Sequence, residues 1–567
     1  MKNTKILALV GIIIFASILR LYKLDKNPPS LFGDELDLGY QAYSILKTGR
    51  DYSGNFLPLH FHSLAEWRTP LYLYSAVPTV ALFGITAWGV RLPAAIFGIL
   101  TIPLIYFLFK ELSQKFDFKI KNIELIASLL LAISPWHIQY SRAGFEVTQM
   151  LFFLLLGLFL FFKSFKEGKW LWISIMSFCL TPYDYSTAKL FTPFFLLFLL
   201  IVFWKEIRKI PKIHLLEGIV AGILFGGPIA LSTLFGGGTV RFNYISVFSD
   251  PTIQNEVGVA RQTEAHVRGE SGSGLTPTIL DKIFNNKFNT ISEVIAQNYL
   301  QSFSFNFLFG KGDPNLRQSA ETGLFYKIEV TSFAAGSVFF FSQVKSKKLK
   351  LLILFWFLIG ALPAELTRDG GNHATRLFLT LPLFILLISY GLTKFPKTVL
   401  IAYALILLSM FISYEHLFWT RYPLDSERWW HYGYGEAFNF VKQNDQNYDK
   451  IIISTHDEPP WIFFAGHLEF NPSLWQQNYP FPKINFLGFG EISHIGKYYF
   501  GSPKINGGLY GWGKLLDSRT LYLASQKEVS INLVQEPERT PANLKVIKAI
   551  IYPSGEPAFY IFSGIGK

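Results

Sequence analysis

Charged residues are scarce in this sequence. Only 16% of its 567 residues are Asp, Glu, Lys or Arg, whereas soluble domains carry about a quarter. Half of the residues are apolar, 17% are aromatic, and the mean hydropathy is positive at +0.29. These values exclude an ordinary soluble protein and predict a chain with many membrane spans.

Cysteine is almost absent as well. The one cysteine, Cys179, lies inside an apolar run, so no intramolecular disulfide can form. Exported regions without disulfides suit a prokaryotic plasma membrane better than a secretory lumen. The middles of the apolar runs also lack ionisable residues, which mark the ion paths of transporters. Charged residues gather instead at the ends of these runs, which favours chemistry at a membrane face.

Long apolar runs are the strongest positive feature. A spanning helix needs roughly 20 mostly apolar residues. Eleven runs come near that length, and they cover 6–24, 88–109, 122–138, 147–162, 170–182, 190–204, 213–233, 326–342, 350–366, 377–393 and 398–417. A twelfth stretch, 70–86, is interrupted by Pro70, Pro78 and Gly84, and it is either a further span or a segment at the membrane surface.

The distribution of Lys and Arg decides between these two topologies, because both concentrate in cytoplasmic loops. If 70–86 does not span, the cytoplasmic segments hold nineteen Lys or Arg against four Asp or Glu, and they are 1–5, 110–121, 163–169, 205–212, 345–350 and 394–397. We therefore predict eleven spans, a cytoplasmic N-terminus and an extracytoplasmic C-terminus. The net charge of +12 then faces lipid headgroups and does not indicate nucleic acid. The first run lacks a cleavage site, so we expect a span there and not a removed signal.

This topology divides the chain into a membrane domain, 1–417, and an extracytoplasmic tail, 418–567. The tail alternates short apolar runs with turn signals and predicts a mixed α/β domain. Two further segments, 25–69 and 234–325, are external loops. Residues 250–275 are polar and rich in Gly and Ser, so we expect a mobile loop there.

The first external loop contains the most informative segment, 33–46. Leu36, Tyr40 and Tyr43 recur at helical spacing, and Gly49 is placed to end that helix. Asp34 and Glu35 fall at its N-terminus. One interpretation is structural, since Asp is a good N-cap and acids suit a first helical turn. The other is a general base beside the lipid headgroups that takes a proton from an acceptor.

Short motifs follow this acidic pair in a fixed order. They are Gly49-Arg50-Asp51, Leu57-Pro58-Leu59, Arg68-Thr69-Pro70-Leu71-Tyr72, Phe83-Gly84, Arg91-Leu92-Pro93, Ser134-Pro135-Trp136-His137, Ser141-Arg142-Ala143-Gly144-Phe145-Glu146 and Asn372-His373-Ala374-Thr375-Arg376. Their order and placement over 1–417 resembles the protein O-mannosyltransferase and aminoarabinose transferase group of GT-C glycosyltransferases. That group has an Asp-Glu pair after its first span. The tail carries no such motif.

The resemblance implies a GT-C fold and an inverting glycosyltransferase. The enzyme would move a sugar, mannose or a related one, from a polyprenyl-phosphate donor to a protein, lipid or glycan acceptor at the outer face of the plasma membrane. It implies catalytic roles for Asp34, Glu35 and Glu146, with Asp34 as the base. The leaving phosphate needs positive charge, and the candidates are Arg68, Arg142, His373 and Arg376. We expect Asp34, Glu146 and Arg376 to surround one cavity.

A metal ion is the one cofactor that we considered. Some enzymes of this group hold a divalent metal through Glu and His in external loops, where this chain has Glu66, His60, His62 and His137. No pair has a tight ligand spacing such as HExxH. We assign no metal and no other cofactor.

Two other classes of function stay open. Trp429-Trp430-His431-Tyr432-Gly433 resembles the Trp-Trp-Asp-Tyr-Gly motif of oligosaccharyltransferases, with His431 in place of the Asp, although an aromatic belt at the membrane surface explains it too. A lipid-linked sugar transporter or flippase would need paired broken helices or charge at mid-depth, and the sequence has neither. We expect the tail to contribute to acceptor choice.

Overall fold

The computed structural model describes residues 2–63, 66–116, 120–235, 240–270, 276–478, 483–484 and 490–566. Contacts divide the chain into two compact units. The bundle unit comprises Met1–Ala16, Phe97–Gln139 and Glu146–Tyr414. The loop–tail unit comprises Ser17–Ile96, Tyr140–Phe145 and Glu415–Lys567, so it unites most of the first external loop with the tail. The predicted domain boundary at 417–418 stays a prediction.

Every predicted span is helical in the structure. The helices are α1 (Lys2–Leu21), α4 (Ala87–Lys115), α5 (Ile123–Ile133) with α6 (Pro135–Ser141), α7 (Val147–Ser164), α8 (Leu171–Asp184), α9 (Thr187–Val202), α11 (Lys212–Ala221) with η2 (Gly222–Gly226) and α12 (Gly227–Phe235), α17 (Glu329–Gln343), α18 (Lys347–Glu365), α19 (Ala374–Leu377) with η5 (Phe378–Thr380) and α20 (Leu381–Leu392), and α21 (Lys397–Thr420). Six of the described helices are long and apolar enough to cross a membrane. The polytopic helical class is thereby confirmed, and the count of eleven stays a prediction.

Helix α3 (Leu71–Phe83) occupies the ambiguous stretch 70–86. Its 13 residues rise about 20 Å, which is short of the roughly 30 Å of a hydrocarbon core. Gly84 ends the helix in a positive-φ conformation, and its N–H donates to the Val80 carbonyl at 2.8 Å. The length of α3 favours the interpretation in which 70–86 does not span.

Helices α17 and α20 of the bundle unit touch through their backbones. A Cβ added at Gly336 would lie 1.8 Å from the Leu387 carbonyl oxygen, and one at Gly391 would lie 1.9 Å from the Ser332 carbonyl oxygen. Such close approach is available only to glycine at these two positions. Small residues at the contact are a common device of helix pairs in membranes, where apolar side chains gain little by pairing.

Residues 252–270 and 276–302 form a helical hairpin, composed of α14 (Thr252–Val267), α15 (Ile279–Phe284) and α16 (Lys287–Ser302). The prediction of a mobile loop over 250–275 is therefore wrong for 252–267, and 271–275 lie outside the described residues. Ile253, Val257 and Ala265 recur at helical spacing and are buried. Gly and Ser are concentrated in 269–274 only, so the composition of the whole window concealed a helix.

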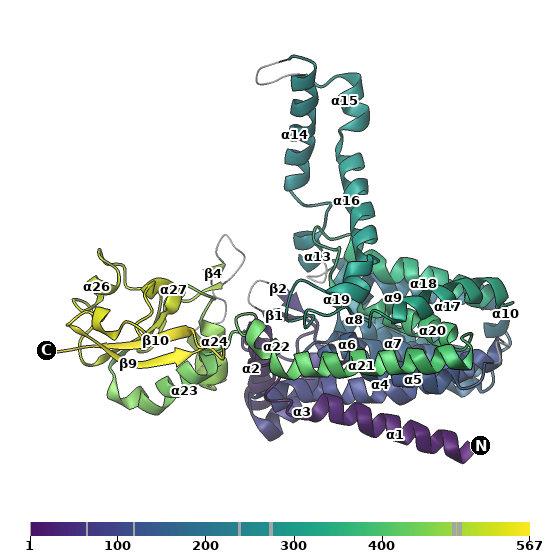
Figure 1. Ribbon diagram of the computed structural model, residues 1–567, viewed down its shortest axis with the longest axis horizontal. Helices are drawn as coiled ribbons and strands as arrows, with labels where there is room; N and C mark the ends of the chain where they lie inside the picture. Colours follow the sequence, from purple (N-terminus) through teal and green to yellow (C-terminus); the bar gives the residue numbers. More distant parts are fainter. Residues whose placement is uncertain are drawn as a thin grey trace. The chain divides into compact units, whose positions relative to one another are not determined.

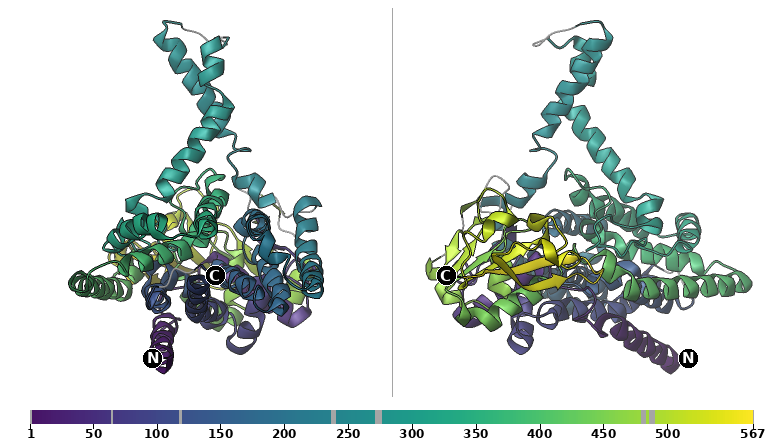
Figure 2. Two further views of the ribbon diagram at one scale, coloured as in Figure 1. Left: turned by 90° about the vertical axis from the view of Figure 1, so that its right-hand side faces the viewer. Right: turned by 60° about the vertical axis from the view of Figure 1, so that its left-hand side comes forward.

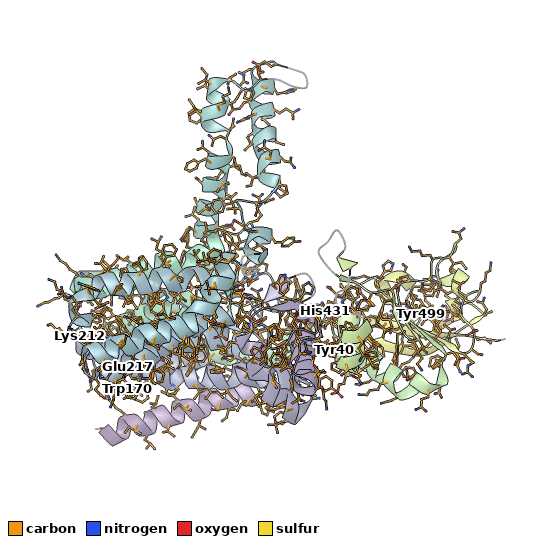
Figure 3. The ribbon with its side chains drawn as sticks, turned by 180° about the vertical axis from the view of Figure 1, so that it is seen from behind. Tyr40, Trp170, Lys212, Glu217, His431 and Tyr499 are labelled. Carbon is orange, nitrogen blue, oxygen red and sulfur yellow. The ribbon has the colours of Figure 1, made fainter. Side chains whose placement is uncertain are left out.

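The hairpin runs crosswise to the long helices of the bundle unit (Figure 1 and Figure 2). The opposite end of the bundle carries the lysine-rich loops, and Figure 3 labels Trp170, Lys212 and Glu217 there. We call these two ends the hairpin end and the basic end. Short helices at them are η1 (Gly168–Trp170) and α10 (Trp204–Ile207) at the basic end, and α13 (Val240–Ile245) and η4 (Asn306–Gly310) near the hairpin.

The tail contains a six-stranded mixed sheet in the order β6-β7-β3-β8-β10-β9. Strand β3 (Lys450–Ile453) runs parallel to both of its neighbours, and the other pairs are antiparallel. The remaining strands of the sheet are β6 (His494–Ile495), β7 (Tyr498–Phe500), β8 (Thr520–Ser525), β9 (Leu544–Ile551) and β10 (Pro557–Gly564). The helices of the tail include α22 (Tyr422–Asp425), α23 (Tyr434–Asn444), α24 (Trp461–His467), α25 (Pro472–Asn478), α26 (Leu509–Trp512) and α27 (Gln526–Val529). The predicted mixed α/β tail is confirmed.

The first-loop helix α2 (Gly33–Thr48) shares a hydrophobic core with the tail. Leu36 and Tyr40 are fully buried in one cluster with Phe463 and Trp475. The Tyr40 hydroxyl donates to the Phe470 carbonyl at 3.1 Å. The α2 helix confirms the predicted apolar face at these two positions, and Gly49 ends the helix as expected, with φ 69°.

Candidate functional site

Asp34 lies in the first turn of α2 but does not cap it. The N-cap residue is Phe32, and no side chain accepts a capping hydrogen bond there, so the N-cap interpretation of Asp34 is wrong. The side chain of Asp34 is 49% exposed, and its Oδ1 lies 2.7 Å from Nη2 of the buried Arg68. Asp34 is therefore an accessible carboxylate held by a buried guanidinium.

Arg68 reaches Asp34 from a short hairpin of the same external loop. Strands β1 (Phe61–Ser63) and β2 (Glu66–Arg68) pair antiparallel, with Phe61 opposite Arg68. The Gln41 side chain of α2 donates to the His62 carbonyl at 2.8 Å and joins this hairpin to the helix. Two elements close in sequence thus fix both members of the Asp34–Arg68 pair.

Asp37 is a third charged residue beside Asp34 and Arg68, and it was not among the residues predicted from the sequence. It lies one turn after Asp34, is fully buried, and accepts a hydrogen bond from the Ser63 hydroxyl. Its Oδ2 is 3.5 Å from Nε of Arg68. Burial raises the pKa of the Asp37 carboxyl to about 6, and the charge of Arg68 opposes this shift only in part. The i, i+3 spacing of Asp34 and Asp37 was the available signal.

Glu35 has a different environment from its neighbour Asp34. Its carboxylate accepts two hydrogen bonds from Arg91, from Nε and Nη2, each 2.8 Å long, and both side chains are fully buried. The Gly144 N–H also donates to Glu35 at 2.8 Å. Arg91 further binds the carbonyls of Leu24 and Pro28. These contacts give Glu35 a structural role, in which it holds Arg91 and the backbone at Gly144. Both carboxylate oxygens are buried and hydrogen-bonded, so the geometry does not support the predicted catalytic role.

The guanidinium of Arg142 is also occupied by contacts within the protein. Its guanidinium donates to the carbonyl oxygens of Leu19, Lys23 and Asn27 at 2.8 to 3.2 Å, and the residue is fully buried. The guanidinium also lies over the Trp419 ring, 4.9 Å from its centre. These contacts favour a role in shaping the start of the first loop over the predicted role in binding phosphate.

Arg376 lines a cavity of about 220 Å³ in the bundle unit. The cavity lies where α8 leads into α9 and where α18 ends, and its lining is Tyr185, Ser186, Thr187, Lys189, Leu190, Thr233, Phe242, Ile245, Pro363, Leu366, Thr367 and Arg376. Arg376 donates to the Thr367 hydroxyl at 2.6 Å and to Asp369 at 2.8 Å. Lys189 is the second cation of this lining, and the predicted set of phosphate ligands did not include it.

The position of Arg376 depends on Asp313. The Asp313 carboxylate accepts the Ala374 N–H at 2.8 Å and so caps the short helix α19, which carries Arg376. It also accepts the Asn315 N–H at 2.8 Å. Burial raises the pKa of Asp313 to about 6. His373 precedes α19, and its charge interacts with that of Asp369.

Glu146 is the first residue of the bundle unit after the loop–tail segment 140–145, and its carbonyl accepts the Met150 N–H at the start of α7. Its charge acts on the carboxyl of Asp184 at the end of α8. Asp34 and Arg68 belong to the loop–tail unit, whereas Glu146 and Arg376 belong to the bundle unit. The single cavity around Asp34, Glu146 and Arg376 therefore stays a prediction.

The aromatic motif 429–433 lies beside the N-terminus of α2. Trp430 is buried beneath Arg91, whose guanidinium carbon is 5.3 Å from the indole centre. Nδ1 of His431 accepts the Gly33 N–H at 3.3 Å, and Figure 3 labels His431 near Tyr40. His431 also lines a cavity of about 150 Å³ in the tail. That cavity is lined by Arg428, His431, Tyr432, Tyr434, Asp457, Glu458, Ser525, Gln526, Lys527, Tyr552, Pro557, Ala558 and Phe559.

No metal cluster emerges from the described part of the chain, which contains no group of three or more His, Cys, Asp and Glu placed to hold an ion. His60 and His62 lie on or beside β1, and His137 lies in α6 of the bundle unit. The side chain of Glu66 lies outside the described residues. The prediction that no metal is assigned stays untested.

Comparison with known proteins points to one enzyme class. Residues 68–229 match the family described as dolichyl-phosphate-mannose-protein mannosyltransferase. The predicted resemblance to the mannosyltransferase group of GT-C enzymes is confirmed over this segment, which is less than half of the chain.

Two relatives from Bacillus subtilis (strain 168) have names that state the same activity. The inferred mannosyltransferase YkcB is 32% identical over 132 residues, 23% of this chain and 18% of that protein. The inferred mannosyltransferase YycA is 27% identical over 146 residues, 25% of this chain and 20% of that protein. The matches thus span about a fifth of each curated relative.

Two solved structures show a similarity that extends along more of the chain. ArnT from Cupriavidus metallidurans, bound to undecaprenyl phosphate, aligns over 99% of this chain and 98% of its own, with a TM-score of 0.48 and 10% identity. The oligosaccharyltransferase AglB from Archaeoglobus fulgidus aligns over 82% of this chain and 64% of its own, with a TM-score of 0.48 and 14% identity.

Proposed function

We propose that this protein is an inverting glycosyltransferase that moves mannose or a related sugar from a polyprenyl-phosphate donor to a hydroxyl or amine acceptor. The observation that carries the proposal is the cavity at the hairpin end of the bundle, whose walls are largely apolar and whose lining includes Lys189 and Arg376. A polyprenyl phosphate presents the same combination, an apolar chain ending in an anion. The family match over 68–229 supports the choice of mannose.

Asp34 acts as the general base in this proposal. Its ionised carboxylate takes a proton from the acceptor, and the acceptor oxygen or nitrogen attacks C1 of the sugar. The bond between C1 and the phosphate oxygen breaks with inversion, and the polyprenyl phosphate leaves with the electron pair. Lys189 and Arg376 stabilise the negative charge that develops on the leaving phosphate.

Arg68 keeps Asp34 ionised and in place, because a buried guanidinium beside a carboxylate favours its charged form. Asp37 is the second counter-charge of Arg68 and limits how strongly Arg68 binds Asp34. Glu35, Arg91 and Arg142 hold the backbone around this group. In this proposal Asp34 is the catalytic residue, and its neighbours position it.

The proposed orientation follows from charge. The basic end faces the cytoplasm, because its loops carry most of the Lys and Arg that flank the spans. The N-terminus is then cytoplasmic, and the tail, the first loop and the hairpin are extracytoplasmic. The enzyme resides in the plasma membrane.

We assign acceptor selection to the cavity of the tail. Its Tyr432 and Tyr552 rings, with Asp457 and Glu458, offer apolar faces and carboxylates that suit a glycan or a polar peptide. Oligosaccharyl transfer is the second candidate, because the 429–433 motif lies against the N-terminus of the helix that carries Asp34. Competition between polyprenyl-phosphate mannose and a polyprenyl-diphosphate oligosaccharide separates the two donors.

The test uses purified protein in nanodiscs and radiolabelled polyprenyl-phosphate mannose. Binding of this donor should weaken when Lys189 or Arg376 is replaced by Ala, whereas Lys212→Ala at the basic end should bind like the wild type. Donor binding that is unchanged by both substitutions in folded protein would overturn the assignment of the cavity.

A further inference from the structure

The hairpin of α14, α15 and α16 exposes large apolar side chains at its tip. We call this set the apolar tip, and it consists of Ile279, Leu280, Ile283, Phe284 and Phe288. Phe284 and Phe288 are 63% and 78% exposed. These five large exposed apolar residues lie within ten positions of the sequence, and such a concentration of apolar side chains on a protein surface marks an interaction site.

Polar contacts hold the two arms of the hairpin together at the tip. Arg268 at the end of α14 binds the buried Asp281 of α15, with two contacts of 3.2 Å. Arg261 donates to the Asn285 carbonyl at 2.8 Å. A capping box between Thr278 and Asp281 starts α15. The tip is therefore a folded structure in which Asp281 is paired inside while the large apolar side chains are exposed.

The base of the hairpin fixes its depth along the bundle. Asn298 of α16 donates to the Glu365 and Thr367 carbonyls at the end of α18, at 3.1 and 2.9 Å. The Tyr299 hydroxyl donates to the Leu358 carbonyl at 3.0 Å. Leu358 precedes Glu365 by seven residues, a rise of about 10 Å. The C-terminal part of α16 thus lies beside the last turns of a span.

The direction of the hairpin is the third observation. It runs crosswise to the long helices of the bundle unit, and α15 and α16 lie on the side of α14 that is nearer the basic end (Figure 1). A hairpin that leaves the end of a span crosswise to it runs along the membrane plane. Its α15–α16 side then faces the lipid.

We propose that the hairpin lies in the membrane interface at the hairpin end of the bundle, with the apolar tip inserted among the lipids of that leaflet. Interfacial helices bury their apolar face roughly 5–10 Å into the boundary of headgroups and acyl chains. At the base of the hairpin, Leu354 and Leu358 of α18 are exposed as well. Apolar burial drives the insertion, because 252–302 hold four Lys or Arg against five Asp or Glu. Lys282 and Lys287, which are exposed between the apolar residues of the tip, extend their charged ends to the headgroups.

The experiment measures depth with a fluorescent label. Cys179, the one cysteine, is replaced by Ser, and a new cysteine at Phe284 is labelled with an environment-sensitive dye in full-length protein in nanodiscs. The matched control carries its cysteine at Gln262, an exposed position on α14. Lipids with a nitroxide on the acyl chain should quench the label at 284 strongly and the label at 262 weakly. Aqueous iodide should give the opposite order.

A label at Ile279 provides a second probe if the variant at 284 does not fold. Equal quenching of the tip and control labels by iodide would overturn the proposal. A tip label shielded from both quenchers only in nanodiscs that hold two copies would assign the patch to a dimer contact, and it would also overturn lipid insertion. The result does not depend on transfer activity, so it stands apart from the proposed enzymatic function.

Discussion

Two regions of this molecule handle charge in opposite ways. Around Asp34 in the loop–tail unit, one buried guanidinium serves two carboxylates, Asp34 and Asp37. In the cavity of the bundle unit, two cations, Lys189 and Arg376, lie in a largely apolar lining. The first arrangement suits a group that accepts a proton, and the second suits a group that binds an anion. A transferase needs both, one for the acceptor and one for the leaving phosphate.

Within the first region, the adjacent residues Asp34 and Glu35 also lie in different environments. Asp34 is half exposed beside Arg68, whereas Glu35 is fully buried against Arg91 and Gly144. A sequence motif of two acids thus contains one accessible carboxylate and one structural carboxylate. A substitution of Asp34 should therefore reduce activity, whereas a substitution of Glu35 should reduce stability.

Asp34→Asn should produce the largest loss of activity. Removal of a general base typically lowers the rate about 10²–10⁴-fold, while the loss of the exposed side of the Arg68 pair should leave the fold intact. The measurement is the initial rate of sugar transfer by purified protein, with the melting temperature recorded in parallel. Asp25→Asn, which alters another acid of the same loop, is the control. Transfer at the wild-type rate by Asp34→Asn would overturn the assignment of Asp34 as the base.

Glu35→Gln should instead reduce stability. Removal of one charge from a buried, hydrogen-bonded ion pair typically costs about 3–5 kcal/mol, since Arg91 would keep its charge without its partner. Chemical or thermal unfolding in detergent measures this loss. A stable Glu35→Gln protein that fails to transfer sugar would restore the catalytic role predicted from the motif.

Arg376→Gln should weaken donor binding without a comparable effect on acceptor activation. A hydrogen bond to a charged group contributes about 1.5–3 kcal/mol, so the KM for the donor should rise roughly 10- to 100-fold. Lys189→Gln should have a similar effect, and Asp313→Asn should raise the donor KM less, because it acts only through α19. An unchanged donor KM in both cation variants would separate the cavity from the donor.

Asp37 predicts a pH dependence of acceptor activation, which is measured at saturating donor because the pKa of Asp313 beside the cation cavity is also raised to about 6. Below about pH 6 the Asp37 carboxyl is neutral, so Arg68 binds Asp34 more strongly and weakens it as a base. Transfer by the wild type should fall as the pH drops through 6. Asp37→Asn, which fixes the neutral state, should be slow at pH 8 and should lack this acid limb. A pH–rate profile for the two proteins provides the test.

The same substitution should raise stability at neutral pH. The folded-state pKa of Asp37 lies above its ordinary value of 3.8, so stability falls as the pH rises from 3.8 to 6 and the buried group ionises. Asp37→Asn should therefore stabilise the protein at pH 7 by up to about 3 kcal/mol, the free energy of two pKa units. Lower stability of Asp37→Asn at pH 7 than at pH 4, relative to the wild type, would contradict this sign.

Tyr432→Ala should have the smallest effect, and only on the acceptor. Loss of one aromatic face costs about 0.5–1.5 kcal/mol, which raises the acceptor KM several-fold and leaves the donor KM unchanged. Such a point variant is a better probe of the tail than truncation near residue 420. Truncation would remove Phe463 and Trp475 from the core that buries Leu36 and Tyr40, and it would unfold the helix that carries Asp34.

Local patterns account for what the sequence predicted well. The helices of the spans, the α2 helix and its end at Gly49 all follow from apolar periodicity and from glycine. The roles of Glu35 and Arg142 were not predictable in this way, because their partners lie far away in the chain: Arg91 is 56 residues from Glu35, and Leu19 is 123 residues from Arg142. The burial of Asp37 depends on Ser63, which is 26 residues away. Contacts between residues so far apart in the chain leave no pattern in the local sequence.

The contact between α17 and α20 has a consequence for handling the protein outside its native bilayer. At Gly336 and Gly391 the two backbones meet directly, and no lipid tail can take part in that contact. The pair is therefore insensitive to the exchange of lipid for detergent, which solvates side chains on the perimeter. Extraction into detergent should leave these two helices packed together. Peripheral helices such as α1, whose surface is mostly exposed, should become mobile first. One added methyl group, as in Gly336→Ala, should be enough to make the protein fragile in micelles.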